Sequence, residues 1–220
     1  MIKAVIFDLD GLLANTEIIS YKIYQDMLAK YNFSFSIEYY AQNYSGKSEK
    51  NNLTSIIAQF ELPMRLEEGY KYIEKREMEL LEKGVELKSG AKELLQYLTS
   101  NNYKIGLATS SKRERAETIL EMNNVYQYFD SLTYTNEVKN GKPYPDIFLK
   151  ASEKLSVSPE ECLVLEDSEA GIEAGYQANM RVINIPDMKK PSEKYRKMMV
   201  KQCESLLEVI SYLEKFNRKG

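Results

Sequence analysis

A short apolar segment that ends abruptly in two carboxylates and a glycine restricts the fold of this chain more than any other feature. Residues 2–7 are apolar and rich in β-branched side chains apart from Lys3, which is typical of a strand buried on both faces of a parallel sheet. Asp8, Asp10 and Gly11 follow directly. Ligands bind at the carboxyl ends of such strands. The two aspartates are therefore candidates for a nucleophile or metal ligand and a neighbouring acid or base, although Asp and Gly are also ordinary turn residues.

Histidine is absent from the 220 residues. Its absence excludes Ser-His-Asp and Cys-His catalysis and every metal site with a histidine ligand. Acid–base chemistry near neutral pH must then fall to carboxylates, Lys, Tyr or Cys. A metal ion would be bound by oxygen atoms, which favours Mg²⁺ over Zn²⁺.

Charge and composition limit the partners and the compartment. The net charge of −3 gives no reason to expect nucleic acid or an anionic membrane as a partner. No apolar run approaches the roughly 18 residues of a membrane span, and Asp8 and Asp10 interrupt the N-terminal run, so no signal peptide is expected. Cys162 and Cys203 have no metal-binding spacing and form no disulfide framework. We expect a cytoplasmic protein, either a monomer or a weak dimer.

After the first turn, the pattern becomes helical for about seventy residues. Apolar residues recur at three- and four-residue spacing in three segments: 18–31, 48–60 and 66–83. This pattern predicts an all-helical domain at 16–83, inserted into a core formed by 1–15 and 84–220.

From residue 84 onward, strands alternate with helices. Four strands are predicted there: 104–108, 131–135, 162–165 and 181–185. We expect an α/β fold with a Rossmann-like parallel sheet. Ser111 and Glu114 have the spacing of a capping box for the helix that follows the first of these strands.

Polar residues occur at or just beyond the ends of the predicted strands, and they should meet at one edge of the sheet. They form four groups: Asp8 with Asp10, Thr109 with Ser110, Lys142, and Glu166 with Asp167. Carboxylates gathered in this way would repel one another without a cation, so Asp8 and Asp167, with or without Glu166, are candidate Mg²⁺ ligands.

The remaining polar groups at this edge suit phosphate. Thr109 and the backbone N–H of Ser110 lie at the start of a predicted helix, where phosphate oxygens bind well. Lys142 would bring a positive charge to the same phosphate.

Four motifs in this order resemble those of haloacid-dehalogenase-superfamily phosphohydrolases, close to the β-phosphoglucomutase-like branch. The motifs are Asp8-x-Asp10-Gly11, the hydroxyl at Thr109, the segment 141–146 (GKPYPD) and the segment 166–172 (EDSEAGI). One such motif is a weak signal, but four in order from residue 8 to residue 172 are a strong one. The resemblance implies the superfamily's α/β core with the helical insertion as its cap domain, which closes over the substrate.

The resemblance also implies residue roles. Asp8 would attack phosphorus and form an aspartyl-phosphate, and Asp10 would protonate the leaving oxygen and later deprotonate the attacking water. Mg²⁺ would be bound by Asp8, the backbone carbonyl of Asp10, Asp167 and, directly or through water, Glu166. Lys142, together with Thr109 and Ser110, would stabilise the charge on the phosphoryl group.

The predicted cap offers less certain candidates. Lys47, in the segment 45–48, could contact the substrate, or the segment could be only a turn and a helix N-cap. The cap tyrosines could stack on a sugar or base, but side chains of this kind more often fill a small helical core.

The function expected from these patterns is a Mg²⁺-dependent phosphatase acting on a small phosphorylated metabolite, a sugar phosphate or a nucleotide. A sugar phosphomutase is the alternative, but Ser20 and Glu49 stand where the mutase pattern has a histidine and an arginine, although Lys47 or Lys50 could compensate. A phosphonate hydrolase would need a cap lysine that forms a Schiff base, for which Lys47 is the candidate. A non-catalytic binding protein is disfavoured because every catalytic position is filled.

Overall fold

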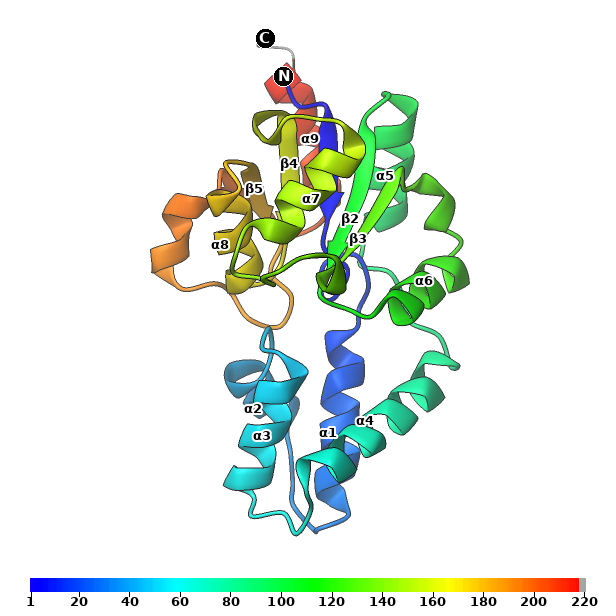
Figure 1. Cartoon of the computed structure of the whole chain (residues 1–220), viewed down its shortest axis with the longest axis vertical. Coiled ribbons are helices and arrows are strands. Elements are labelled where there is room, and N and C mark those ends of the chain that lie inside the picture. The colour runs from blue at the N-terminus through cyan, green and yellow to red at the C-terminus, as the bar shows by residue number, and fades with distance from the viewer. Residues whose placement is uncertain (218–220) are drawn as a thin grey trace. The chain divides into compact units, whose positions relative to one another are not determined.

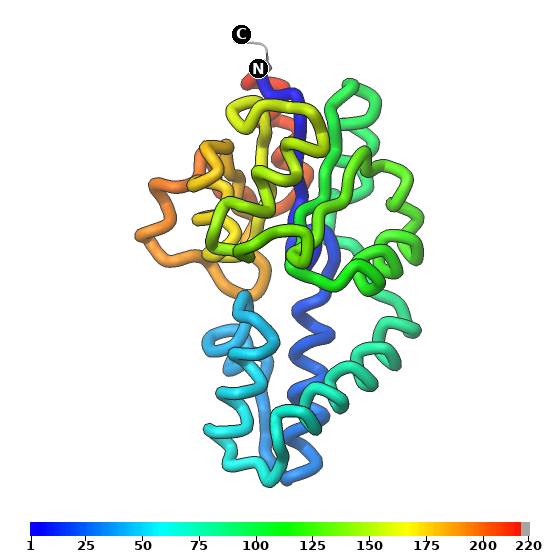
Figure 2. Tube along the Cα trace, viewed as in Figure 1, coloured from blue at the N-terminus to red at the C-terminus, as the bar shows by residue number. Residues whose placement is uncertain are grey.

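The computed structural model describes residues 1–217. Its contacts divide the chain into two units, Met1–Asn15 with Val85–Gly220, and Thr16–Gly84. The trace leaves the first unit after Asn15 and returns to it at Val85 (Figure 2). Gly84 belongs to the helical unit, one residue beyond the predicted insertion, because its N–H still donates to Leu81 O at the end of the last helix.

The first unit is built on a six-stranded sheet in the order β3-β2-β1-β4-β5-β6, with all pairs parallel (Figure 1). The strands are β1 (Ala4–Phe7), β2 (Lys104–Thr109), β3 (Ser131–Tyr134), β4 (Cys162–Glu166), β5 (Arg181–Asn184) and β6 (Lys201–Gln202). The expected α/β fold with a Rossmann-like parallel sheet is confirmed. The sequence did not predict β6, because two residues are too few to show a period.

The strand order reverses direction at β1, which lies between β2 and β4. All four residues of β1 are buried, as the apolar run predicts. In open parallel sheets, ligands bind beyond the carboxyl ends of the strands where the order reverses. The ends of β1, β2 and β4 are therefore the expected position of a site.

Five α-helices of this unit are α5 (Ala91–Ser100), α6 (Arg113–Met122), α7 (Asp146–Leu155), α8 (Glu169–Gln177) and α9 (Leu207–Asn217). Figure 1 shows α7 and α8 in front of the sheet and α9, which packs on α5, behind it. Gly175 lets α8 lie close to the sheet, since a Cβ there would come within 2.7 Å of Val182 Cγ2. The buried core in front of the sheet includes Ile6, Phe148 and Val164.

The second unit contains α1 (Glu17–Ala29), α2 (Ile37–Asn43), α3 (Glu49–Gln59) and α4 (Leu66–Leu81). Its core is aromatic: the Phe35 ring contacts the rings of Tyr21, Tyr39, Tyr40, Tyr44 and Phe60. The buried hydroxyl ends find partners, for example Tyr40 Oη on Glu17 Oε2 at 2.9 Å. Tyrosines 24, 40 and 44 thus fill the helical core, whereas Tyr39 is exposed. None of the helices among residues 1–217 has the length and apolarity needed to cross a membrane.

Candidate active site

The turn after β1 presents two aspartates in different directions. Asp8 still pairs with β4, since its N–H donates to Leu165 O at 3.1 Å. The chain then folds back on itself: Gly11 adopts a positive φ of 78°, and its N–H donates to Ala14 O at 3.0 Å. A positive φ is easily adopted only by glycine, so Gly11 allows the tight turn that begins directly after Asp10.

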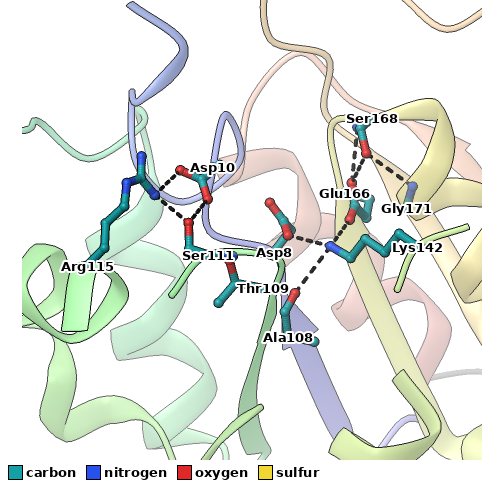
Figure 3. A network of polar contacts seen from close by, with 10 residues as sticks. All are labelled: Asp8, Asp10, Ala108, Thr109, Ser111, Arg115, Lys142, Glu166, Ser168 and Gly171. Carbon is teal, nitrogen blue, oxygen red and sulfur yellow. Dashed lines mark hydrogen bonds and ion pairs between the residues drawn. The ribbon is translucent and has the colours of Figure 1, made fainter. Parts of the chain in front are cut away.

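Lys142 lies between two buried carboxylates (Figure 3). Its Nζ is 2.5 Å from Asp8 Oδ1 and 2.5 Å from Glu166 Oε1, and it also donates to Ala108 O at 3.3 Å. Only 8% of the Lys142 side chain is exposed. A solvated loop lysine would not have these contacts, so Lys142 is part of the site.

Burial and charge act together on these groups. Burial raises the pKa of the Asp8 carboxyl, Lys142 opposes the increase, and repulsion from Glu166 and Asp10 adds to it. Burial by itself lowers the pKa of Lys142, but attraction to Asp8 and Glu166 outweighs burial and raises it above the ordinary value. Lys142 therefore stays protonated at neutral pH.

Asp8, Glu166 and Asp167 form an acidic cluster in which one carboxylate oxygen of each lies within 4.8 Å of the others. Lys142 supplies a single positive charge against these three carboxylates. The donors are all hard oxygen atoms, so the cluster fits Mg²⁺ better than a softer metal.

Glu166 is held by α8. Its Oε2 accepts hydrogen bonds from Ser168 N at 3.1 Å and Ser168 Oγ at 2.9 Å, while Oε1 faces Lys142. The carboxylate lies directly against Gly171, where a Cβ would come within 1.8 Å of it. Glu166 thus has partners on both oxygens and contacts Lys142 in addition to belonging to the acidic cluster.

Asn184, at the end of β5, holds the backbone of Glu166 and Asp167. Its buried side-chain amide donates to the backbone carbonyls of Glu166 and Asp167, both at 3.0 Å. Gln202 Nε2 donates in turn to Asn184 Oδ1 at 3.0 Å. The sequence pattern did not indicate this contact, although Asn184 lies near the carboxyl end of the predicted strand 181–185, at the same edge of the sheet.

Asp10 is held by the start of α6 (Figure 3). Ser111 Oγ donates to Asp10 Oδ2 at 2.6 Å, and Arg115 Nη1 lies 2.6 Å from Asp10 Oδ1. The predicted capping box of Ser111 and Glu114 is therefore wrong. Lys112 is the N-cap residue, without a side-chain cap, and the Ser111 hydroxyl bonds to Asp10 instead.

The remaining candidates lie in two places. Thr109 is buried at the end of β2, where its Oγ1 accepts a hydrogen bond from Ser111 N at 3.0 Å, and Ser110 is exposed immediately after it.

Lys47 belongs to the helical unit and is exposed in the turn before α3. Ser48 caps that helix by accepting a hydrogen bond from Asn51 N at 3.3 Å, which is compatible with either interpretation of Lys47.

Comparison with known proteins identifies related sequences along most of the chain. Residues 5–185 match the family model described as haloacid dehalogenase-like hydrolase. A phosphorylated carbohydrates phosphatase from Thermotoga maritima is 31% identical over 82% of this chain and 83% of that protein. The β-phosphoglucomutase of Bacillus subtilis is also 31% identical, over 83% of each chain.

The fold has close counterparts among solved structures. A crystal structure of β-phosphoglucomutase from Clostridium difficile matches with a TM-score of 0.79 and 28% identity, covering 100% of this chain and 99% of that one. The similarity therefore includes both the sheet with its helices and the helical unit.

Proposed function

Because this chain belongs to the haloacid dehalogenase-like hydrolases, we propose that it is a Mg²⁺-dependent phosphatase that hydrolyses a small phosphorylated metabolite. One observation carries the proposal: Asp8, directly after β1, contacts Lys142 on one side and belongs to an acidic cluster of hard oxygen donors. These contacts, beyond the strand ends where the sheet order reverses, support Asp8 as the nucleophile, Lys142 as the phosphate-binding cation and the acidic cluster as the metal-binding group.

In the proposed reaction, an Asp8 carboxylate oxygen attacks phosphorus, and the bond from phosphorus to the ester oxygen breaks. Asp10 gives its proton to the leaving oxygen. Asp10 then accepts a proton from a water molecule as that water attacks phosphorus, and the bond between Asp8 and phosphorus breaks. The products are the alcohol, inorganic phosphate and the free Asp8 carboxylate.

The other residues support these steps electrostatically. Lys142, Thr109 and the Ser110 N–H bind oxygens of the phosphoryl group and stabilise its charge. Asp8, Asp167, the backbone carbonyl of Asp10 and, directly or through water, Glu166 would bind Mg²⁺. When bound, Mg²⁺ acts as a Lewis acid that offsets the negative charge of the phosphoryl group.

The substrate proposed is a sugar phosphate or a nucleotide. The helical unit is proposed to serve as the cap domain of the family, and Lys47 as a contact to the substrate. The related phosphatase from Thermotoga maritima, whose name specifies phosphorylated carbohydrates, supports the sugar phosphate.

The compartment that we propose is the cytoplasm. Both cysteines are free and buried, in keeping with a reducing compartment.

A phosphate-release screen tests the proposal. The purified protein is incubated with a panel of phosphorylated sugars and nucleotides in the presence of Mg²⁺, and inorganic phosphate is measured. We expect release from at least one class of monophosphate. Absence of release from every member of a broad panel would contradict the proposal.

The relatives that are β-phosphoglucomutases support a phosphomutase as the second candidate. A mutase must protect its aspartyl-phosphate from hydrolysis. The bisphosphate intermediate has to turn round in the site and return a phosphoryl group to the aspartate. Ser20 lies on α1 and Glu49 at the start of α3, at positions where the mutase pattern has a histidine and an arginine. A carboxylate at position 49 would repel a second phosphate, which favours the phosphatase.

The two candidates give different products from glucose 1-phosphate. We expect no appreciable glucose 6-phosphate, even with a bisphosphate primer, and phosphate release from monophosphates. Efficient primed isomerisation with little phosphate release would establish the mutase instead.

A further inference from the structure

Asp187 carries a buried carboxylate oxygen without a hydrogen-bond donor. It lies three residues beyond β5, and only 8% of its side chain is exposed. Its Oδ1 pairs with Lys88 Nζ. Its Oδ2 is buried and has no hydrogen-bond partner, and no other carboxylate oxygen among residues 1–217 is in this state.

The unpartnered oxygen points toward the acidic cluster. A Cβ placed on Gly11 would lie 2.5 Å from Asp167 Oδ2 and 3.2 Å from Asp187 Oδ2. Two carboxylate oxygens therefore approach the same glycine, one from the segment after β4 and one from the segment after β5. Since Asp167 belongs to the acidic cluster with Asp8 and Glu166, Asp187 extends the cluster on the side of Gly11.

An unpartnered buried carboxylate oxygen is costly, and a second carboxylate nearby increases the cost. Lys88 offsets the charge at Oδ1 but leaves Oδ2 without a donor. Asp167 cannot supply the donor, since an ionised carboxylate only accepts hydrogen bonds. A bound Mg²⁺ ion keeps several water molecules, and their O–H groups are donors that a carboxylate outside the direct ligands can accept from.

We propose that Asp187 is an outer-sphere residue of the divalent-cation site, with Oδ2 accepting a hydrogen bond from the hydration shell of a cation bound by Asp8 and Asp167. Lys88 fixes the orientation of the Asp187 carboxylate. This assignment rests on the metal dependence in the proposed function. The competing interpretation is that Lys88 and Asp187 form an ion pair that only stabilises the fold.

Isothermal titration calorimetry of Mg²⁺ and Mn²⁺ into the metal-stripped full-length protein separates the two interpretations. Asp187→Asn keeps the shape of the side chain but removes its charge, and we expect the dissociation constant to rise about 10- to 100-fold, as for other outer-sphere partners. Lys88→Met breaks the same ion pair but removes a positive charge near the site. We expect it to bind the cation as tightly as the unmodified protein, or more tightly.

A purely structural ion pair gives a different pattern. Both variants would then lower the melting temperature of the metal-free protein, and both would bind the cation within about twofold of the unmodified protein, which would overturn the proposal. If Asp187→Asn does not fold, the double variant Lys88→Met/Asp187→Asn replaces it, because it leaves no unpaired lysine. The proposal then requires this double variant to bind more weakly than Lys88→Met.

The unmodified protein distinguishes failure of this inference from failure of the proposed function. If it binds neither cation, the proposed metal dependence is wrong and the assignment of Asp187 fails with it. If it binds a cation and Asp167→Asn weakens binding but Asp187→Asn does not, only the assignment of Asp187 is wrong.

Discussion

Arg115 contacts the carboxylate of Asp10, with 2.6 Å between Nη1 and Oδ1. The same nitrogen lies 2.5 Å from Ser111 Oγ, which donates to the second oxygen of Asp10. Ser111 directly precedes the N-cap residue Lys112, and Arg115 lies in the first turn of α6, so the two side chains meet at the N-terminal end of this helix. Only 16% of the Arg115 side chain is exposed, and this restricts its movement and that of the carboxylate it holds.

The first prediction is that Arg115 acts as a positioning residue for Asp10. Properly placed general acids and bases contribute about 10²–10⁴-fold to rate, so Arg115→Ala should lower kcat by about tenfold or more. KM should change much less, since Asp10 acts on the leaving group. Arg115→Lys should recover part of the loss because it restores the charge without the planar guanidinium.

Arg113→Ala is the matched control for Arg115→Ala. Arg113 is on the same helix, but its side chain is 58% exposed and stacks on the Tyr134 ring. Steady-state kinetics of the three variants should show loss of kcat only at position 115. An unchanged kcat in Arg115→Ala would disprove the positioning role.

The second prediction concerns the nucleophile. Asp8→Asn keeps the volume of the side chain and still lets Oδ1 accept from Lys142, so the protein should remain folded. Turnover should fall by about a thousandfold or more, because an amide oxygen cannot replace the carboxylate as nucleophile. Circular dichroism checks the fold and phosphate release checks the activity. Substantial turnover in folded Asp8→Asn would rule out the aspartyl-phosphate route.

The third prediction concerns the metal. Chelation by EDTA should abolish phosphate release, and excess Mg²⁺ should restore it. Ca²⁺ should restore little, because it prefers higher and looser coordination than Mg²⁺. Phosphate release after dialysis against EDTA and metal-free buffer is the measurement. Full activity in EDTA would mean that the acidic cluster of Asp8, Glu166 and Asp167 binds no catalytic cation.

The sequence predicts the centre of the sheet well because β1, β2 and β4 are mostly apolar runs followed by polar residues. It does not predict α2 or β6, since seven residues and two residues are too few for a reliable period. The position of the acidic residues at one sheet edge follows from strand direction alone. The strand ends were therefore sufficient to bring Asp8 and Glu166 together as candidates, whereas Lys142 lies in the loop after β3 and was indicated by the motif at 141–146.

Side-chain partners are harder to predict than backbone positions. The motif of Ser111 and Glu114 predicts a cap, but the Asp10 carboxylate competes for the same hydroxyl and forms a charge-assisted hydrogen bond. Arg115 was not among the residues expected at the site from the sequence, although it lies only four residues after Ser111. For Asp187, no local pattern shows that one of its oxygens lacks a donor, since that depends on residues from three separate segments.

The last prediction uses Gly171 to test whether Glu166 positions Lys142. Glu166 lies so close to α8 that a Cβ on Gly171 would be 1.8 Å from its carboxylate. Gly171→Ala must therefore displace Glu166 from Ser168 and from Lys142. A hydrogen bond to a charged group contributes about 1.5–3 kcal/mol, so kcat/KM should fall roughly 10- to 100-fold if Lys142 loses its position.

Gly175→Ala is the matched control, because Gly175 lies one turn further along the same helix. A Cβ there would be 2.7 Å from Val182 Cγ2 and 3.3 Å from Val164 Cγ1, so the substitution overpacks the helix against the sheet without touching Glu166. Overpacking of this kind costs about 1–3 kcal/mol of stability. Thermal melts should show both variants destabilised, and kinetics well below both melting temperatures should show the fall in kcat/KM only for Gly171→Ala. Equal kcat/KM values for the two variants would mean that Glu166 does not control the position of Lys142.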